Sequence, residues 1–122
     1  MHQTVRVLWP QFWALRPVWN GGTILDVSEE PFFIDSQFEL GQLVMTHGVQ
    51  EEIAVEEVIH AIQRHAQCDW GDLDAEDLRA NERALTNSDR LLSVYQSSTR
   101  VKFYVITESD RSVTTALLPS EY

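Results

Sequence analysis

The sequence predicts an α+β fold in which two helices pack on one face of a small antiparallel sheet, in the order β-α-α-β-β-β. Residues 50–67 place apolar side chains at helical spacing opposite a row of acids, which is typical of an amphipathic helix. After residue 90, three runs rich in β-branched and aromatic residues are joined by short polar connections, which favours an antiparallel meander.

Local hydrophobic patterns predict where each element lies. The expected helices cover residues 50–67 and 75–85, and the polar stretch TNSD ends the second. The expected strands cover residues 42–46, 90–96, 100–107 and 112–119. No internal repeat or low-complexity tract interrupts this order, so a single core is expected.

Residues 1–37 differ in composition from the rest of the chain, since they hold Trp9, Trp13 and Trp19 and are rich in proline. Short strands are expected at 5–9, 23–27 and 31–35. Because exposed tryptophans are costly, we expect this segment to pack as an N-terminal extension on a single α+β domain formed by residues 38–122. Two alternatives stay open: the aromatic side chains bind another molecule, or the extension is only loosely ordered.

The charge balance limits the classes of partner. The chain of 122 residues carries 19 acids against 9 bases, for a net charge of -10. Such acidity disfavours direct binding to nucleic acid or to an anionic membrane, because both depend on Lys and Arg. Arginines and prolines interrupt the apolar N-terminus, which argues against a signal peptide, and no apolar run approaches the roughly 20 residues of a membrane helix. Cys68 is the only cysteine, which suits a reducing compartment, so we expect a cytoplasmic protein.

Five acids in the stretch DWGDLDAED, residues 69–77, raise the question of a metal loop or a set of catalytic carboxylates. If Asp72 is taken as the first position of an EF-hand loop, the position that requires glycine is Asp77. The position that requires a bidentate glutamate is Arg83. A calcium loop is therefore not expected.

A helix start explains most of the same stretch. Asp74 is placed as the N-cap, and acids follow it in the first turn, where negative charge suits the helix dipole. Leu73 and Leu78 occupy the two positions of a hydrophobic staple. Gly71 permits a sharp turn and Trp70 is placed to anchor it in the core. The acids left without a structural reason are Asp69 and Asp72.

The spacing of His60, His65 and Cys68 raises the question of a metal site or a cysteine nucleophile. Residues five apart on a helix point in different directions, whereas zinc ligands on one helix usually lie three or four apart. The neighbouring acids would raise the pKa of the Cys68 thiol and so disfavour a nucleophile. The favoured interpretation is one packed histidine, one capping histidine and a buried thiol, with no catalytic residue, metal or cofactor.

Other acids are candidates for contact with a protein partner, although solvated acidic faces are common. Asp110 lies in the turn ESDRS, where it is expected to shape the turn while Arg111 pairs across the hairpin. The candidate partner-binding residues are Glu51, Glu52, Glu56, Glu57, Asp69, Asp72 and Asp110.

Residues 38–122 carry two specific blocks, DWGDLDAED and ITESDRSVTT followed by LLPSEY. In these blocks the chain resembles a family of small proteins from plasmids and integrative elements. Its members are labelled "plasmid-related protein" or "type I restriction endonuclease subunit M". The chain is too short for a methyltransferase fold and carries no cofactor-binding glycine motif, so the resemblance implies a mobile-element setting and no such activity.

Charge and resemblance together favour a non-enzymatic acidic accessory protein of a plasmid or other mobile element that binds a protein partner. Acidity suits attraction to basic surfaces, and occupation of a basic nucleic-acid-binding surface would inhibit a host defence complex (CRISPR or restriction) as a DNA mimic does. One alternative is a small metal-dependent enzyme or nuclease-associated factor that uses His60, His65 and Cys68. The other is a self-associating structural module, such as a homodimer.

Overall fold

The structure is a computed structural model, and it describes residues 3–7, 17–18, 22–24 and 32–122. The strands are β1 (Gln3–Val7), β2 (Pro17–Val18), β3 (Gly22–Ile24), β4 (Phe32–Ser36), β5 (Gln42–Thr46), β6 (Leu91–Gln96), β7 (Lys102–Thr107) and β8 (Val113–Leu117). The helices are α2 (His47–Glu52), α3 (Val55–Ala66) and α4 (Ala75–Asn87), and the 3-10 helix η2 (Pro119–Glu121) follows β8. The fold is therefore α+β.

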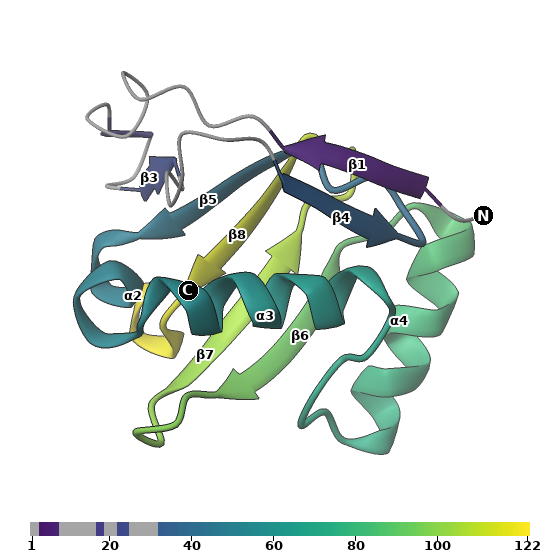
Figure 1. The fold of residues 1–122 in the computed structure, drawn as a ribbon. Coiled ribbons are helices and arrows are strands. Elements are labelled where there is room, and N and C mark those ends of the chain that lie inside the picture. Colours follow the sequence, from purple (N-terminus) through teal and green to yellow (C-terminus); the bar gives the residue numbers. More distant parts are fainter. Residues whose placement is uncertain (1–2, 8–16, 19–21, 25–31) are drawn as a thin grey trace.

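The described strands form a mixed sheet in the order β2-β3-β5-β8-β7-β6, and β1 pairs separately with β4 (Figure 1). The predicted antiparallel meander of β6, β7 and β8 is confirmed. The prediction of an entirely antiparallel sheet is wrong, because β5 runs parallel to β8, with Val44 opposite Thr115. The helical crossover returns the chain so that β6 runs in the direction of β5, and the meander then places β8, which has that same direction, beside β5.

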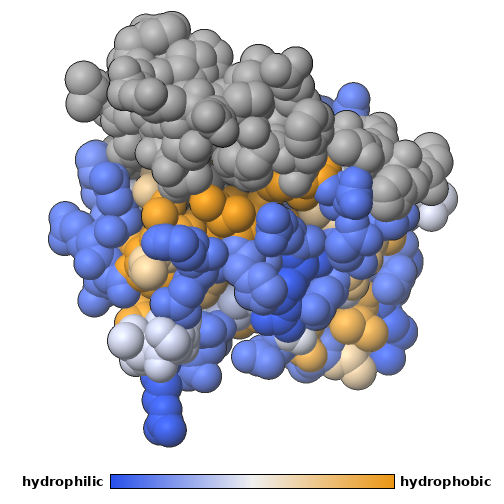
Figure 2. Space-filling model, in the orientation of Figure 1, coloured by the Kyte–Doolittle hydropathy of each residue, from blue (hydrophilic) through white to orange (hydrophobic). Residues whose placement is uncertain are grey.

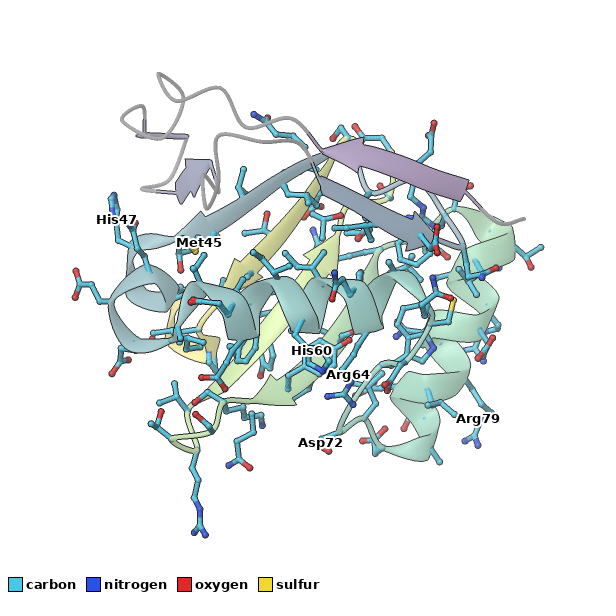
Figure 3. All side chains as sticks on the ribbon, in the orientation of Figure 1. Met45, His47, His60, Arg64, Asp72 and Arg79 are labelled. Atoms are coloured by element: carbon cyan, nitrogen blue, oxygen red, sulfur yellow. The ribbon has the colours of Figure 1, made fainter. Side chains whose placement is uncertain are left out.

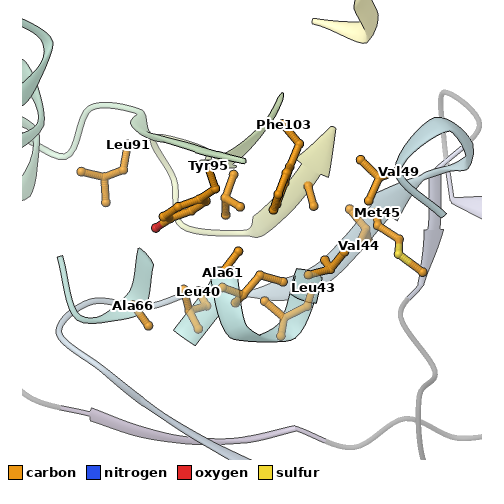
Figure 4. Packing of buried hydrophobic residues seen from close by; sticks show 14 of the residues in the cluster. Leu40, Leu43, Val44, Met45, Val49, Ala61, Ala66, Leu91, Tyr95 and Phe103 are labelled. Atoms are coloured by element: carbon orange, nitrogen blue, oxygen red, sulfur yellow. The ribbon is translucent and has the colours of Figure 1, made fainter. Parts of the chain in front are cut away.

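Helix α3 covers one face of this sheet and forms the centre of the core (Figure 1). It buries Val58, Ala61 and Ile62 in a cluster that includes Phe103 and Tyr95 from the strands (Figure 4). Full burial of a large apolar side chain contributes about 1.5–3 kcal/mol relative to exposure. This amphipathic packing is the feature that the spacing of apolar residues predicts.

The single helix predicted over residues 50–67 is instead two helices, α2 and α3. The chain is extended at Ile53 (φ -129°, ψ 132°) and at Ala54, which is the N-cap of α3. This break lets the side chain of Ile53 reach the core, where it is 4% exposed. Thr46 caps the start of α2, since its hydroxyl accepts a hydrogen bond from the Val49 N–H.

Helix α4 lies along the edge strand β6, so the prediction that both helices pack on one face holds for α3 and is wrong for α4. Of its side chains only Asn81 and Ala84 are buried. The Asn81 amide donates to the Leu92 carbonyl at 2.6 Å and accepts from the Leu92 N–H at 3.1 Å. These two bonds occupy outward-facing backbone groups that an uncovered edge strand would offer to another chain.

In the N-terminal region, the strands expected at 5–9, 23–27 and 31–35 correspond in part to β1, β3 and β4. Strand β3 pairs with β5 and so extends the main sheet. The three N-terminal tryptophans lie outside the described residues. Their packing on the core, like a domain boundary at residue 37, stays a prediction.

Candidate functional site

The acid-rich stretch 69–77 starts a helix, as predicted. The Asp74 carboxylate caps α4 by accepting a hydrogen bond from the Asp77 N–H at 2.8 Å. Gly71 has φ +73°, and Trp70 is only 3% exposed in the core. The predicted staple is wrong at one position, because Leu78 is 42% exposed and so does not close over the helix start.

Asp69, one of the acids left over in this stretch, has a structural partner. Arg64 donates to its carboxylate from Nε at 2.8 Å and from Nη2 at 3.2 Å. These hydrogen bonds lower the pKa of the Asp69 carboxyl. The Arg64 guanidinium also lies over the Tyr95 ring, with 4.8 Å between Cζ and the ring centroid. The carboxylate of Asp72 lies near this pair (Figure 3) and has no partner within the described residues, so it is the acid of the stretch that is still unexplained.

Three acids gather at the corner where α2 ends and α3 begins, and we call Glu51, Glu52 and Glu56 the acidic corner. All three are exposed, and their carboxylates form no hydrogen bond or ion pair with the part of the chain that the structure describes. Glu57 differs, because its carboxylate accepts from the Ser98 N–H at 2.7 Å and from the Ser98 hydroxyl at 3.1 Å. Glu57 therefore ties α3 to the β6–β7 turn.

The predicted partner-binding acids do not form one patch. Asp110 lies in the β7–β8 turn, where it accepts hydrogen bonds from the N–H and the hydroxyl of Ser112, as expected for a turn-forming acid. Glu57 contacts the turn at the opposite end of β7, and a strand of this length spans about 20 Å. Helix α3, about 18 Å long, separates the acidic corner from Asp69 in the same way.

His65 is a structural residue at the centre of a buried polar chain. Its Nδ1 lies 2.5 Å from the Ser93 hydroxyl, and its Nε2 lies 2.9 Å from the Thr107 hydroxyl. The Thr107 hydroxyl bonds in turn to that of Thr114, which donates to the Leu40 carbonyl at 2.6 Å. Burial, reinforced by the charge of Arg111, lowers the pKa of His65 to about 3, so the ring is neutral at physiological pH.

The structure does not bring His60, His65 and Cys68 together into one site. His60 is exposed on α3, whereas His65 is fully buried with both ring nitrogens bonded. Burial, with a smaller effect of Glu82, raises the pKa of the Cys68 thiol, which disfavours a thiolate nucleophile. Among the described residues, no group of three or more His, Cys, Asp or Glu side chains is placed to hold a metal ion.

Two arginines of α4, Arg79 and Arg83, form no ion pair with the acids of the same helix within the described residues. In the part of the chain that the structure describes, the Arg–carboxylate ion pairs are Arg64 with Asp69 and Arg90 with Glu108, the latter at 3.2 Å. Both arginines of α4 are exposed, and a pair at such positions gains little, because water solvates each charge well.

Arg111 bonds mainly to the end of α4. The sequence predicted that it would pair across its hairpin, and there it reaches the Glu108 carbonyl but forms no ion pair with an acid within the described residues. Its Nη1 donates to the carbonyls of Asp89 at 2.7 Å and Glu108 at 3.1 Å, and its Nη2 donates to the Ala84 carbonyl at 3.1 Å. These contacts place a cation at the negative end of the helix dipole. Sequence reasoning missed this role, because only the fold brings the β7–β8 turn to the end of α4.

The hollows among the described residues include a groove and a pocket. A groove of about 220 Å³ lies between α3 and the β6–β7 end, where Glu57, His60 and Tyr95 line it. A pocket of about 500 Å³ lies beside the end of α4, with Phe38 and Arg111 in its wall. On the face seen in Figure 2, the described surface is mainly hydrophilic, with hydrophobic residues in a band above α3.

Comparison with protein-family models, with curated proteins and with solved structures finds no match to this chain. The resemblance to plasmid-related proteins therefore stays a prediction that rests on the two sequence blocks. Among the described residues, no helix combines the length and the apolar character needed to cross a membrane.

Proposed function

We propose that this protein is a non-enzymatic accessory protein of a plasmid or other mobile element, and that it binds a basic surface of a partner protein through the acidic corner. The observation that carries the proposal is the state of the three carboxylates of the corner. They are exposed and have no partner within the described residues, whereas Asp69 and Asp110 are held by their own neighbours. Carboxylates that their own fold does not engage are available to a partner's Lys and Arg side chains.

The proposal extends to the inhibition of a host defence complex. Surfaces that bind DNA or RNA concentrate Lys and Arg side chains that contact phosphates. A protein with net charge -10 is attracted to such a surface over a distance comparable to the Debye length. Because the acidic corner and Asp72 lie near opposite ends of α3, they present negative charge at both ends of one helix, about 18 Å apart.

The test compares two triple variants that remove the same amount of charge. The corner variant carries Glu51→Gln, Glu52→Gln and Glu56→Gln. The control variant carries Glu76→Gln, Asp77→Asn and Glu82→Gln, all exposed positions of α4. Each tagged protein is used to capture partners from a lysate of the host cell, and the bound proteins are identified by mass spectrometry.

We expect the wild type and the control variant to retain a common basic partner and the corner variant to lose it. Raising the salt to about 1 M should release this partner, because the Debye length then falls to about 3 Å. Equal retention by both variants would refute the role of the corner, and equal loss would show that net charge alone matters. Binding that survives about 1 M salt would rule out electrostatic mimicry of nucleic acid.

A further inference from the structure

The pocket beside the end of α4 has the size and lining of a small-molecule site, and we call it the Arg111 pocket. Its volume is about 500 Å³, and its apolar wall is formed by Phe38, Cys68 and Leu85. Thr86 and Arg111 add polar groups. Small-molecule sites typically have volumes of about 300–1,000 Å³ and combine a mainly apolar wall with a few polar groups.

Arg111 lines this pocket with a guanidinium that is fixed in place but only partly used. Backbone carbonyls accept from both of its Nη atoms and hold the group rigidly. The Nε–H and one Nη2–H donate to no acceptor among the described residues. Nε and Nη2 form the edge of a guanidinium that binds a carboxylate side-on.

Two arginines that form ion pairs show how the Nε and Nη2 edge of a guanidinium is used elsewhere in the protein. Arg64 uses Nε and Nη2 to hold Asp69, and Arg90 uses the same two atoms to hold Glu108. Arg111 has no carboxylate within ion-pair distance in the described part of the chain. It is also half-buried, and burial lowers its pKa by more than the nearby charge of Asp89 raises it.

We infer that the Arg111 pocket binds a small amphipathic carboxylate, which is a ligand site separate from the proposed partner-binding corner. The carboxylate lies side-on against Nε and Nη2 of Arg111, and the apolar body lies against Phe38 and Leu85. A monoanion fits better than a phosphate dianion, because Glu39 also lines the pocket and the negative end of the α4 dipole lies beside it.

The test uses 3-phenylpropionate as the probe and its neutral analogue 3-phenylpropanamide as the matched control. Each is titrated into the 122-residue chain, and backbone amide shifts are followed by NMR. We expect saturable shifts at the pocket residues with a Kd on the order of 1 mM for the carboxylate, the affinity typical of a ligand of this size. The amide should bind at least about tenfold more weakly, because it carries no charge.

Two variants and one chemical reporter complete the test. Arg111→Gln should weaken binding of the carboxylate about tenfold, whereas Arg83→Gln, at an exposed position of α4, should leave it unchanged. If Arg111→Gln fails to fold, the wild type still decides the question. Cys68 is the only thiol in the sequence, so its alkylation by iodoacetamide should be slowed by the carboxylate and not by the amide. Equal binding of both probes, shifts that map outside the pocket, or shifts that do not saturate at about ten times the expected Kd would overturn the inference.

Discussion

Acidification should destabilise this protein through His65, well above the pH at which carboxylates titrate. The folded protein holds the imidazole neutral, because the ring is fully buried and no counter-charge among the described residues faces it. Ser93 and Thr107 occupy its two nitrogens, and Arg111 adds positive charge to its surroundings. The unfolded chain has no such constraint, and its imidazole takes up a proton near pH 6.5, at about the ordinary pKa.

The size of the effect follows from the two pKa values. The folded value is about 3 and the unfolded value is about 6.5, so the contribution of His65 to stability is fully present above about pH 6.5 and is lost as the pH falls toward 3. The full difference between these two pKa values corresponds to about 5 kcal/mol of unfolding free energy, at about 1.4 kcal/mol per pH unit. At pH 5 only the unfolded chain is protonated, and the expected loss of unfolding free energy relative to pH 7.5 is about 2 kcal/mol.

Urea unfolding followed by tryptophan fluorescence at pH 7.5 and pH 5 measures this loss directly. A His65→Gln variant serves as the reference, because an amide has hydrogen-bonding groups but does not titrate in this range. The difference between wild type and variant should shrink by about 2 kcal/mol from the higher to the lower pH. A folded wild type whose His65 ring signals titrate near pH 6.5 in NMR, or a variant with the same pH dependence as the wild type, would refute the reasoning.

Three further substitutions test how the sheet edge and the start of α4 are held. Asn81→Ala should lower the unfolding free energy by about 2 kcal/mol and promote self-association, because it frees backbone groups of the edge strand β6. Urea unfolding measures the first effect and light scattering the second. Gly71→Ala should lower the unfolding free energy by about 2 kcal/mol or more, since φ is +73° and a Cβ would lie 2.0 Å from the Val94 carbonyl oxygen. Thermal unfolding measures this loss. Asp74→Ala should lower the unfolding free energy by about 1 kcal/mol through loss of the N-cap, whereas Asp72→Ala should change it by less than about 0.5 kcal/mol.

Local chemistry made several features of the fold predictable. The Asp74 cap, the turn at Gly71 and the buried Trp70 each depend on residues within a few positions of one another, and all three are confirmed. The meander of β6, β7 and β8 is equally local, because short connections leave neighbouring strands little choice but to pair. The break at Ile53 was missed, since its apolar side chain fits the helical spacing equally well as part of one continuous helix.

Features that depend on distant parts of the chain were not predictable in the same way. No residue of β5 signals that this strand pairs with β8 rather than with β6, because many other residues separate β5 from β8 in the sequence. The contacts of His65 with Ser93 and Thr107 join three elements, and no spacing of residue types marks them in advance. The same holds for Arg111, whose partners Ala84 in α4 and Asp89 just after this helix lie more than 20 positions away in the sequence.

The protein has few basic side chains, so the way each one is used is informative. Arg64 and Arg90 bind carboxylates of their own chain, which leaves these charges balanced on the surface. Arg111 instead binds carbonyls, and these hold the guanidinium in place but leave its Nε–H without an acceptor among the described residues. The acidic corner shows the opposite imbalance, because its carboxylates lack a cation within the described residues. A fold that balances most of its polar groups internally leaves these two places with unmatched charge of opposite sign, so a ligand for one is not expected to compete at the other.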